Sequence, residues 1–155
     1  MLKLQRGIEY FFVSVEELNE LEKQNKVIEK RTYQTIYGPW FYFTVDDGRV
    51  NLKQDNYVLI GTLESYKKVR MYFGPESVIP IYIDVEDGER LARALARERE
   101  QKEPKYAELC RRFLADSTDF SENVIDELNI TKKYENIVLE DCFQNIKNEI
   151  KLYLS

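Results

Sequence analysis

The sequence predicts a single α/β domain over residues 1–155, with a small antiparallel lobe, a parallel-sheet core and a helical segment. In the second two-thirds of the chain, apolar strand-like runs alternate with helical patterns, which is typical of sheets covered by helices. In the first third, short alternating segments are joined by turn residues, as in antiparallel hairpins. With 43% hydrophobic and 33% charged residues, the composition suits one packed core. The expected boundaries are 7–56 for the lobe, 57–86 with 132–155 for the core, and 87–131 for the helices.

The first third of the chain has the pattern of one helix among several short strands. Tyr10–Val13 is an aromatic and β-branched run that predicts a strand. Ser14 follows it, and Glu17 comes three residues later, which is the spacing of a capping box at a helix start. Further strands are expected at 27–29, 33–37, 41–43 and 50–52, with turns at 38–39 and 46–48.

The pattern changes at Asn56, after which four apolar residues follow in succession. Tyr57–Ile60 resembles a strand that is buried on both faces of a parallel sheet. Val78–Ile83 repeats this pattern, although its Pro80 favours a sheet edge or an irregularity. Helices are expected at 64–72, 87–101, 105–115, 121–128 and 140–152, with a last strand at 134–139.

Composition excludes several classes of function. The net charge of −5 argues against a broad nucleic-acid-binding face. No apolar run approaches the roughly 18 residues that predict a membrane span, and Cys110 and Cys142 lack metal-ligand spacing. The absence of histidine excludes Ser-His and Cys-His nucleophiles and histidine-ligated zinc. We therefore expect a cytoplasmic protein with no nucleic-acid partner, no membrane partner and no metal site of its own.

Several segments resemble the guanylate kinase family, the P-loop enzymes that transfer a phosphate from ATP to GMP. The matching pieces are Gly7-x-x-Tyr10-x-Phe12-Val13-Ser14-x-x-Glu17, Ile28-Glu29, Tyr37-Gly38, Arg111-Arg112-Phe113 and the stretch 136–150. The resemblance extends from about Gly7 to the end of the chain. It implies that the lobe at 7–56 holds the monophosphate and that 87–131 forms a lid, with ATP and Mg²⁺ as the cofactors.

The resemblance also implies roles in GMP binding for four residues. Tyr10 and Tyr37 match tyrosines that donate their hydroxyls to the GMP phosphate. Glu29 matches the glutamate that accepts hydrogen bonds from guanine, whose two adjacent N–H donors fit the two oxygens of a carboxylate, whereas adenine has no such pair. Thr62 follows the strand on which the family has aspartates, and it is assigned to the GMP site in their place. The alternative is that the tyrosines are ordinary strand aromatics and Glu29 a solvated carboxylate.

Arginines in the helical segment form a second candidate group. Arg97 and Arg112 are the candidate catalytic residues, because they resemble lid arginines that reach the transferring phosphates. A guanidinium group spreads positive charge over a planar fork that fits phosphate oxygens. The alternative is an exposed helix face, since arginines and glutamates recur there at i,i+4 spacing.

The glycine-rich phosphate loop of the family has no counterpart in this sequence. No G-x-x-x-x-G-K-[ST] motif occurs, so the ATP cradle, its lysine and the Mg²⁺-binding hydroxyl are missing. We therefore expect no cofactor to be bound by this chain and no catalysis by it alone. The missing segment would supply a central strand, and an unpaired sheet edge favours self-association or pairing with a partner chain.

Three hypotheses remain. The first is a guanylate kinase-like chain, truncated or split, that retains at most a GMP-binding pocket. The second is a non-catalytic binding module that uses the old GMP site for a phosphorylated ligand or partner protein, as guanylate kinase-like domains of scaffold proteins do. The third is an active enzyme in which Met1–Gln5 are the end of a longer upstream segment.

Overall fold

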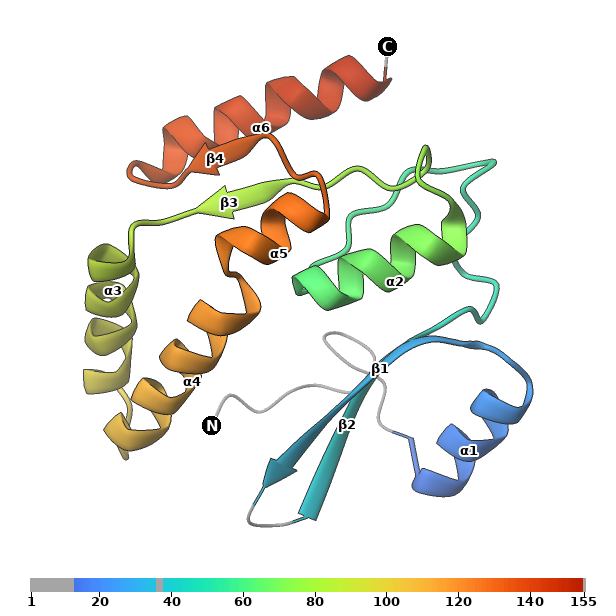
Figure 1. Cartoon of the computed structure of the whole chain (residues 1–155), viewed down its shortest axis with the longest axis horizontal. Helices are drawn as coiled ribbons and strands as arrows, with labels where there is room; N and C mark the ends of the chain where they lie inside the picture. Colours follow the sequence, from blue (N-terminus) through green and yellow to red (C-terminus); the bar gives the residue numbers. More distant parts are fainter. Residues whose placement is uncertain (1–12, 36–37, 155) are drawn as a thin grey trace.

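The computed structural model describes residues 13–35 and 38–154, and every structural statement concerns these residues. Within them the chain is mixed α/β, with six helices and two small sheets of two strands each (Figure 1). The elements are α1 (Val15–Lys23), β1 (Val27–Thr35), β2 (Gly38–Val45), α2 (Leu63–Phe73), β3 (Tyr82–Asp84), α3 (Asp87–Arg99), α4 (Tyr106–Asp119), α5 (Glu122–Glu127), β4 (Lys133–Glu135) and α6 (Leu139–Leu154).

Helix α1 begins where the sequence predicts. The Ser14 Oγ accepts a hydrogen bond from the Glu17 backbone N–H at 3.1 Å, and the Glu17 carboxylate accepts one from the Ser14 N–H at 2.7 Å. This capping box satisfies two backbone donors that a helix start leaves without partners. The helix buries Leu18, which is only 2% exposed.

Strands β1 and β2 form the antiparallel sheet of the lobe. Their register runs from Val27 opposite Val45 to Thr35 opposite Gly38, with an irregularity between Val27 and Glu29. The sequence interpretation of Gly38 and Pro39 as a turn was therefore wrong, because both residues belong to β2. The predicted strand at 10–13 lies outside the described residues except for Val13, which is not in a strand.

A turn follows β2, but the predicted second hairpin does not form. Gly48 has φ +80°, a left-handed conformation that glycine adopts readily, and its N–H donates to Asp46 Oδ1 at 3.1 Å. Beyond it, Val50 and Leu52 are exposed and belong to no strand. Asn51 instead starts another turn, accepting at its carbonyl from Gln54 N–H at 3.0 Å.

The apolar core lies between α2, α5 and the parallel strands. Its most buried side chain is that of Ile125, which is 1% exposed. The residues that make up this core are Leu63, Ile125, Leu128 and Ile130, with Tyr66, Tyr82, Phe120 and Val124 packed against them.

The parallel sheet is much smaller than predicted. Strand β3 pairs with β4 in parallel, from Tyr82 opposite Lys133 to Asp84 opposite Glu135. Helix α6 packs against β4, and α3 packs against α4 (Figure 1). The strands expected at 78–83 and 134–139 are therefore reduced to three residues each. None of the helices in the described part of the chain is long and apolar enough to cross a membrane.

The segment Tyr57–Ile60 is the clearest departure from the sequence prediction. It was expected to be a buried strand, but it has no regular structure, and Val58 and Ile60 are 87% and 97% exposed. A strand exists only when its backbone is hydrogen-bonded to a neighbouring strand. No strand of residues 13–35 or 38–154 pairs with this segment, so its apolar side chains remain uncovered.

Candidate functional site

The lobe buries a negative charge. Glu29 lies in β1 and is 5% exposed. Its Oε1 accepts a hydrogen bond from the Thr44 hydroxyl on β2 at 3.0 Å, and its Oε2 lies 3.3 Å from Arg31 Nε. A carboxylate is rarely buried unless it is paired. Glu29 is therefore held in place by one neutral donor and one cation.

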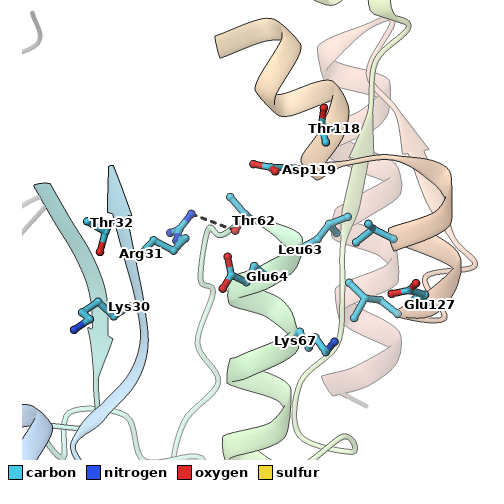
Figure 2. Close-up of a pocket in the computed structure, with 12 residues that line it drawn as sticks. Lys30, Arg31, Thr32, Thr62, Leu63, Glu64, Lys67, Thr118, Asp119 and Glu127 are labelled. Carbon is cyan, nitrogen blue, oxygen red and sulfur yellow. Dashed lines mark hydrogen bonds between the residues drawn. The ribbon is translucent and has the colours of Figure 1, made fainter. Parts of the chain in front are cut away.

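Arg31 connects this carboxylate to helix α2. Residues two apart in a strand share a face of the sheet, so Arg31 lies beside Glu29. Its Nη1 donates to Thr62 Oγ1 at 3.2 Å (Figure 2). Thr62 is the N-cap of α2, and the same Oγ1 accepts from Ser65 N–H at 3.3 Å. The three side chains thus form a continuous polar path from the interior of the lobe to the start of α2.

A cleft opens where this path reaches the surface. It has a volume of about 630 Å³, within the range of roughly 300–1,000 Å³ that is typical of ligand sites. It lies between β1, the start of α2 and the region where α4 ends and α5 follows. The lining residues are Lys30, Arg31, Thr32, Thr62, Leu63, Glu64, Lys67, Thr118, Asp119, Val124, Glu127 and Leu128.

The basic side chains that line the cleft point in different directions. Figure 2 shows the side chain of Arg31 directed toward Thr62 and that of Lys30 directed away from it. The Lys30 ammonium forms an ion pair with Glu22 of α1, on the other face of the strand. Of the basic residues that line the cleft, Arg31 is therefore the one beside the α2 N-terminus, where the partial positive charge of the helix also favours anions.

The predicted GMP-binding residues are only partly tested by this geometry. Glu29 and Thr62 are brought to the two ends of one path through Arg31, which forms an ion pair with Glu29 and a hydrogen bond to Thr62. Tyr10 and Tyr37 lie outside the described residues. Their role in binding a phosphate remains a prediction.

The predicted catalytic arginines do not line the cleft. Arg97 is exposed in the last turn of α3, and Arg112 is exposed on α4. Arg112 lies 3.9 Å from a carboxylate oxygen of Glu98 and 3.9 Å from one of Glu108. A hydrogen bond from Arg111 is the main cause that lowers the pKa of Glu108, and the charges of Arg111 and Arg112 lower it further. Arg112 therefore belongs to a local ion-pair group, which favours the exposed-face alternative for this residue.

The part of the chain that the structure describes identifies no residues that would hold Mg²⁺ or ATP. No group of three or more acidic or cysteine side chains among residues 13–35 and 38–154 could hold a metal ion. Gly74, one of the described glycines with positive φ, ends helix α2 instead of opening a helix toward a phosphate. We derive no reaction step through either cofactor.

Arg31 is the residue that the sequence interpretation missed. Its position two residues after Glu29 in a predicted strand was the available signal, because that spacing places both side chains on one face. Comparisons with known proteins add no assignment: no family model matches the sequence, and no curated protein matches it. Arguments about function therefore depend on the residues and their geometry.

Proposed function

We propose that this chain is a guanylate kinase-like protein that binds GMP, with the guanine edge directed at Glu29 and the phosphate in the cleft beside Thr62. The observation that supports this most is the buried carboxylate of Glu29 at the end of a polar path that opens into a cleft of ligand size. Buried charges with specific partners cluster at functional sites. A carboxylate selects guanine because it accepts two parallel hydrogen bonds from the purine edge.

The proposal includes a family-like lid and a reduced parallel core. We infer that β3 and β4 are the part of that core which forms in this chain, and that α3 and α4, which pack against each other, form a lid carrying Arg97 and Arg112.

Phosphoryl transfer by this chain alone is not part of the proposal. Transfer from ATP needs a phosphate loop, and no G-x-x-x-x-G-K-[ST] motif occurs in the given sequence. A coupled assay with GMP and Mg²⁺–ATP should therefore show no ADP release. Turnover would contradict this, and it would favour a complete enzyme.

The ligand is tested by calorimetry with GMP, AMP and a phosphopeptide. We expect GMP to bind at least about tenfold more tightly than AMP, since each 1.4 kcal/mol of discrimination is tenfold. Glu29→Gln should remove this preference, because an amide presents only one acceptor to the purine. Glu22→Gln is the matched control, since Glu22 pairs with Lys30 on the opposite face of β1.

Two outcomes would change the assignment. Equal affinity for AMP and GMP would exclude Glu29 as the guanine-selecting residue. Binding of the phosphopeptide without binding of GMP would support the second candidate, a non-catalytic module that holds a phosphorylated partner. The absence of a phosphate-loop motif from the given sequence is the observation that favours this candidate.

We also propose that the protein self-associates or pairs with a partner chain through Tyr57–Ile60, and that it acts in the cytoplasm, where Cys110 and Cys142 remain free thiols. The exposure of Val58 and Ile60 supports association, because uncovered apolar segments mark contact surfaces. Light scattering after gel filtration should give a mass that rises with concentration. Ile60→Asp should lower this mass, whereas Leu114→Asp, on exposed α4, should not.

A further inference from the structure

The two oxygens of the buried Glu29 carboxylate differ: Oε1 accepts a hydrogen bond, whereas Oε2 has the charge of Arg31 beside it but no hydrogen bond among the described residues. The Thr44 hydroxyl donates to Oε1 at 3.0 Å, and Arg31 Nε lies 3.3 Å from Oε2. A guanine edge binds a carboxylate through two parallel N–H···O bonds, one to each oxygen. The Arg31 guanidinium therefore lies beside Oε2, an oxygen that the purine edge needs and that has no hydrogen bond among the described residues.

We propose that Arg31 competes with the purine for Glu29 and, once displaced, binds the phosphate of the ligand. In this way Arg31 sets the preference for a phosphorylated purine over the bare nucleoside. This inference rests on the proposed function, and it concerns a residue to which the resemblance gives no role.

The position of Arg31 permits the exchange. Its side chain is 22% exposed, whereas that of Glu29 is 3% exposed, so the guanidinium lies between the buried carboxylate and the cleft. Its Nη1 already contacts Thr62 Oγ1 at the cleft wall (Figure 2). Rotation about the outer torsions of the side chain would turn Nε away from Glu29 while the end of the guanidinium stays near α2.

The displacement of Arg31 from Glu29 is favourable only when the ligand carries a phosphate. When the neutral guanine edge replaces Arg31 at Glu29, the guanidinium loses the ion pair that compensates part of its burial. Breaking a partly buried ion pair is unfavourable. A phosphate restores the compensation through two charge-assisted hydrogen bonds to the planar fork, and guanosine has no group that does so.

Lys30 cannot replace Arg31 in this role. Its ammonium is on the opposite face of β1, paired with Glu22 and 5.8 Å from the centre of the Phe41 ring. Because Lys30 is adjacent in sequence and equally charged, Lys30→Ala is the matched control for Arg31→Ala.

The experiment is a calorimetric titration of the full chain with guanosine and with GMP. The wild-type chain should prefer GMP by at least about tenfold, which corresponds to one charge-assisted contact. Arg31→Ala should reduce this ratio by about tenfold, through weaker GMP binding and unchanged or tighter guanosine binding. Arg31→Lys, which keeps the charge but loses the fork, should give an intermediate ratio, and Lys30→Ala should leave it unchanged.

A second measurement uses the unmodified protein. In ¹H–¹⁵N spectra of arginine side chains, the Nε–H resonance of Arg31 should shift on addition of GMP. Arg31 would have no such role if GMP binds the wild type and the ratio of GMP to guanosine affinity in Arg31→Ala and in Arg31→Lys equals that of the wild type. The proposed function would then stand. Absence of binding of either purine to the wild type would instead overturn the proposed function and this inference with it.

Discussion

The two regions of the molecule bury different kinds of side chain. In the lobe of α1, β1 and β2, the buried side chains among the residues whose burial the structure describes are those of Leu18 and Glu29, one apolar and one charged. In the helical region, from α2 to α6, the buried cluster around Ile125 is apolar. A charge that is buried beside a cleft costs stability that an apolar residue would not. The comparison shows that the lobe stabilises a buried ion pair at the edge of the cleft, whereas the cluster around Ile125 is held by apolar packing.

The two sheets also differ, in the length and connection of their strands. Strands β1 and β2 follow one another in the chain and pair over nearly their whole length. Strands β3 and β4 are three residues each and are separated by three helices. An antiparallel pair needs only a short connection, whereas a parallel pair needs a long crossover and is rarely stable with two strands. The parallel pair therefore depends on the apolar core beneath it.

The largest expected loss in the free energy of unfolding comes from truncating Ile125, the most buried side chain of that core. Ile125→Ala should lower the free energy of unfolding by about 2–5 kcal/mol, through lost apolar burial and the cavity left behind. Urea unfolding followed by circular dichroism measures it. Leu114→Ala, on exposed α4, is the control and should change stability by less than about 0.5 kcal/mol. Equal effects of the two substitutions would mean that the helical region has no packed core.

The corresponding change in the lobe is Glu29→Gln. It should lower the free energy of unfolding by about 1–3 kcal/mol, because Arg31 loses its carboxylate partner while Thr44 retains an acceptor. The same unfolding experiment measures this change. Glu22→Gln, which breaks a more exposed ion pair, should cost less than about 1 kcal/mol. If Glu29→Gln raised stability instead, the buried charge would be a pure cost to folding, and its retention would point even more strongly to binding.

The helices were largely predictable from the sequence, because their signals are local. The Ser14 and Glu17 capping box identifies the start of α1 without any tertiary information. The strand prediction for Tyr57–Ile60 failed for the opposite reason. An apolar run shows that a segment could be buried, but only the rest of the fold decides whether a strand lies beside it.

The candidate site was predictable only in part. Glu29 and Thr62 were identified from a resemblance, but the sequence does not show that Arg31 joins them, since that contact spans 31 positions between Arg31 and Thr62. Arg112 was chosen for its neighbours in sequence, and the structure places it among glutamates of α3 and α4. Ion pairs between helices cannot be told from ligand-binding arginines by spacing alone.

Thr62 lies at the boundary of the two regions, and its substitution should lower the free energy of unfolding by less than the two changes above. Thr62→Val removes the N-cap of α2 and the acceptor of Arg31, and it should cost about 1 kcal/mol of unfolding free energy. Thr118→Val is a matched control in the same cleft, because the Thr118 hydroxyl donates to Leu114 O within α4. A loss confined to Thr62→Val would show that the path from Glu29 stabilises the contact between the regions.

The smallest expected change in stability comes from a second hydrogen bond between the regions, the one that joins Tyr72 and Asp46. Tyr72 of α2 donates its hydroxyl to Asp46 Oδ2, just after β2, at 2.6 Å. This bond is the main cause that lowers the pKa of Asp46 below its ordinary 3.8, and the Gly48 N–H lowers it further. A lowered pKa in the folded state contributes stability that is present above the ordinary pKa and is lost as the pH falls through the lower value.

The advantage of the wild type over Tyr72→Phe should therefore be present near neutral pH and disappear as the pH falls through the lowered pKa of Asp46. It should be small, because both groups are exposed and water screens the interaction. Carboxyl NMR titration gives the more direct measurement: the pKa of Asp46 should rise in Tyr72→Phe, whereas Asp47, whose pKa is lowered mainly by Arg49, should not change. An unchanged Asp46 pKa would show that the Tyr72 hydroxyl does not connect the lobe to the helical region in solution.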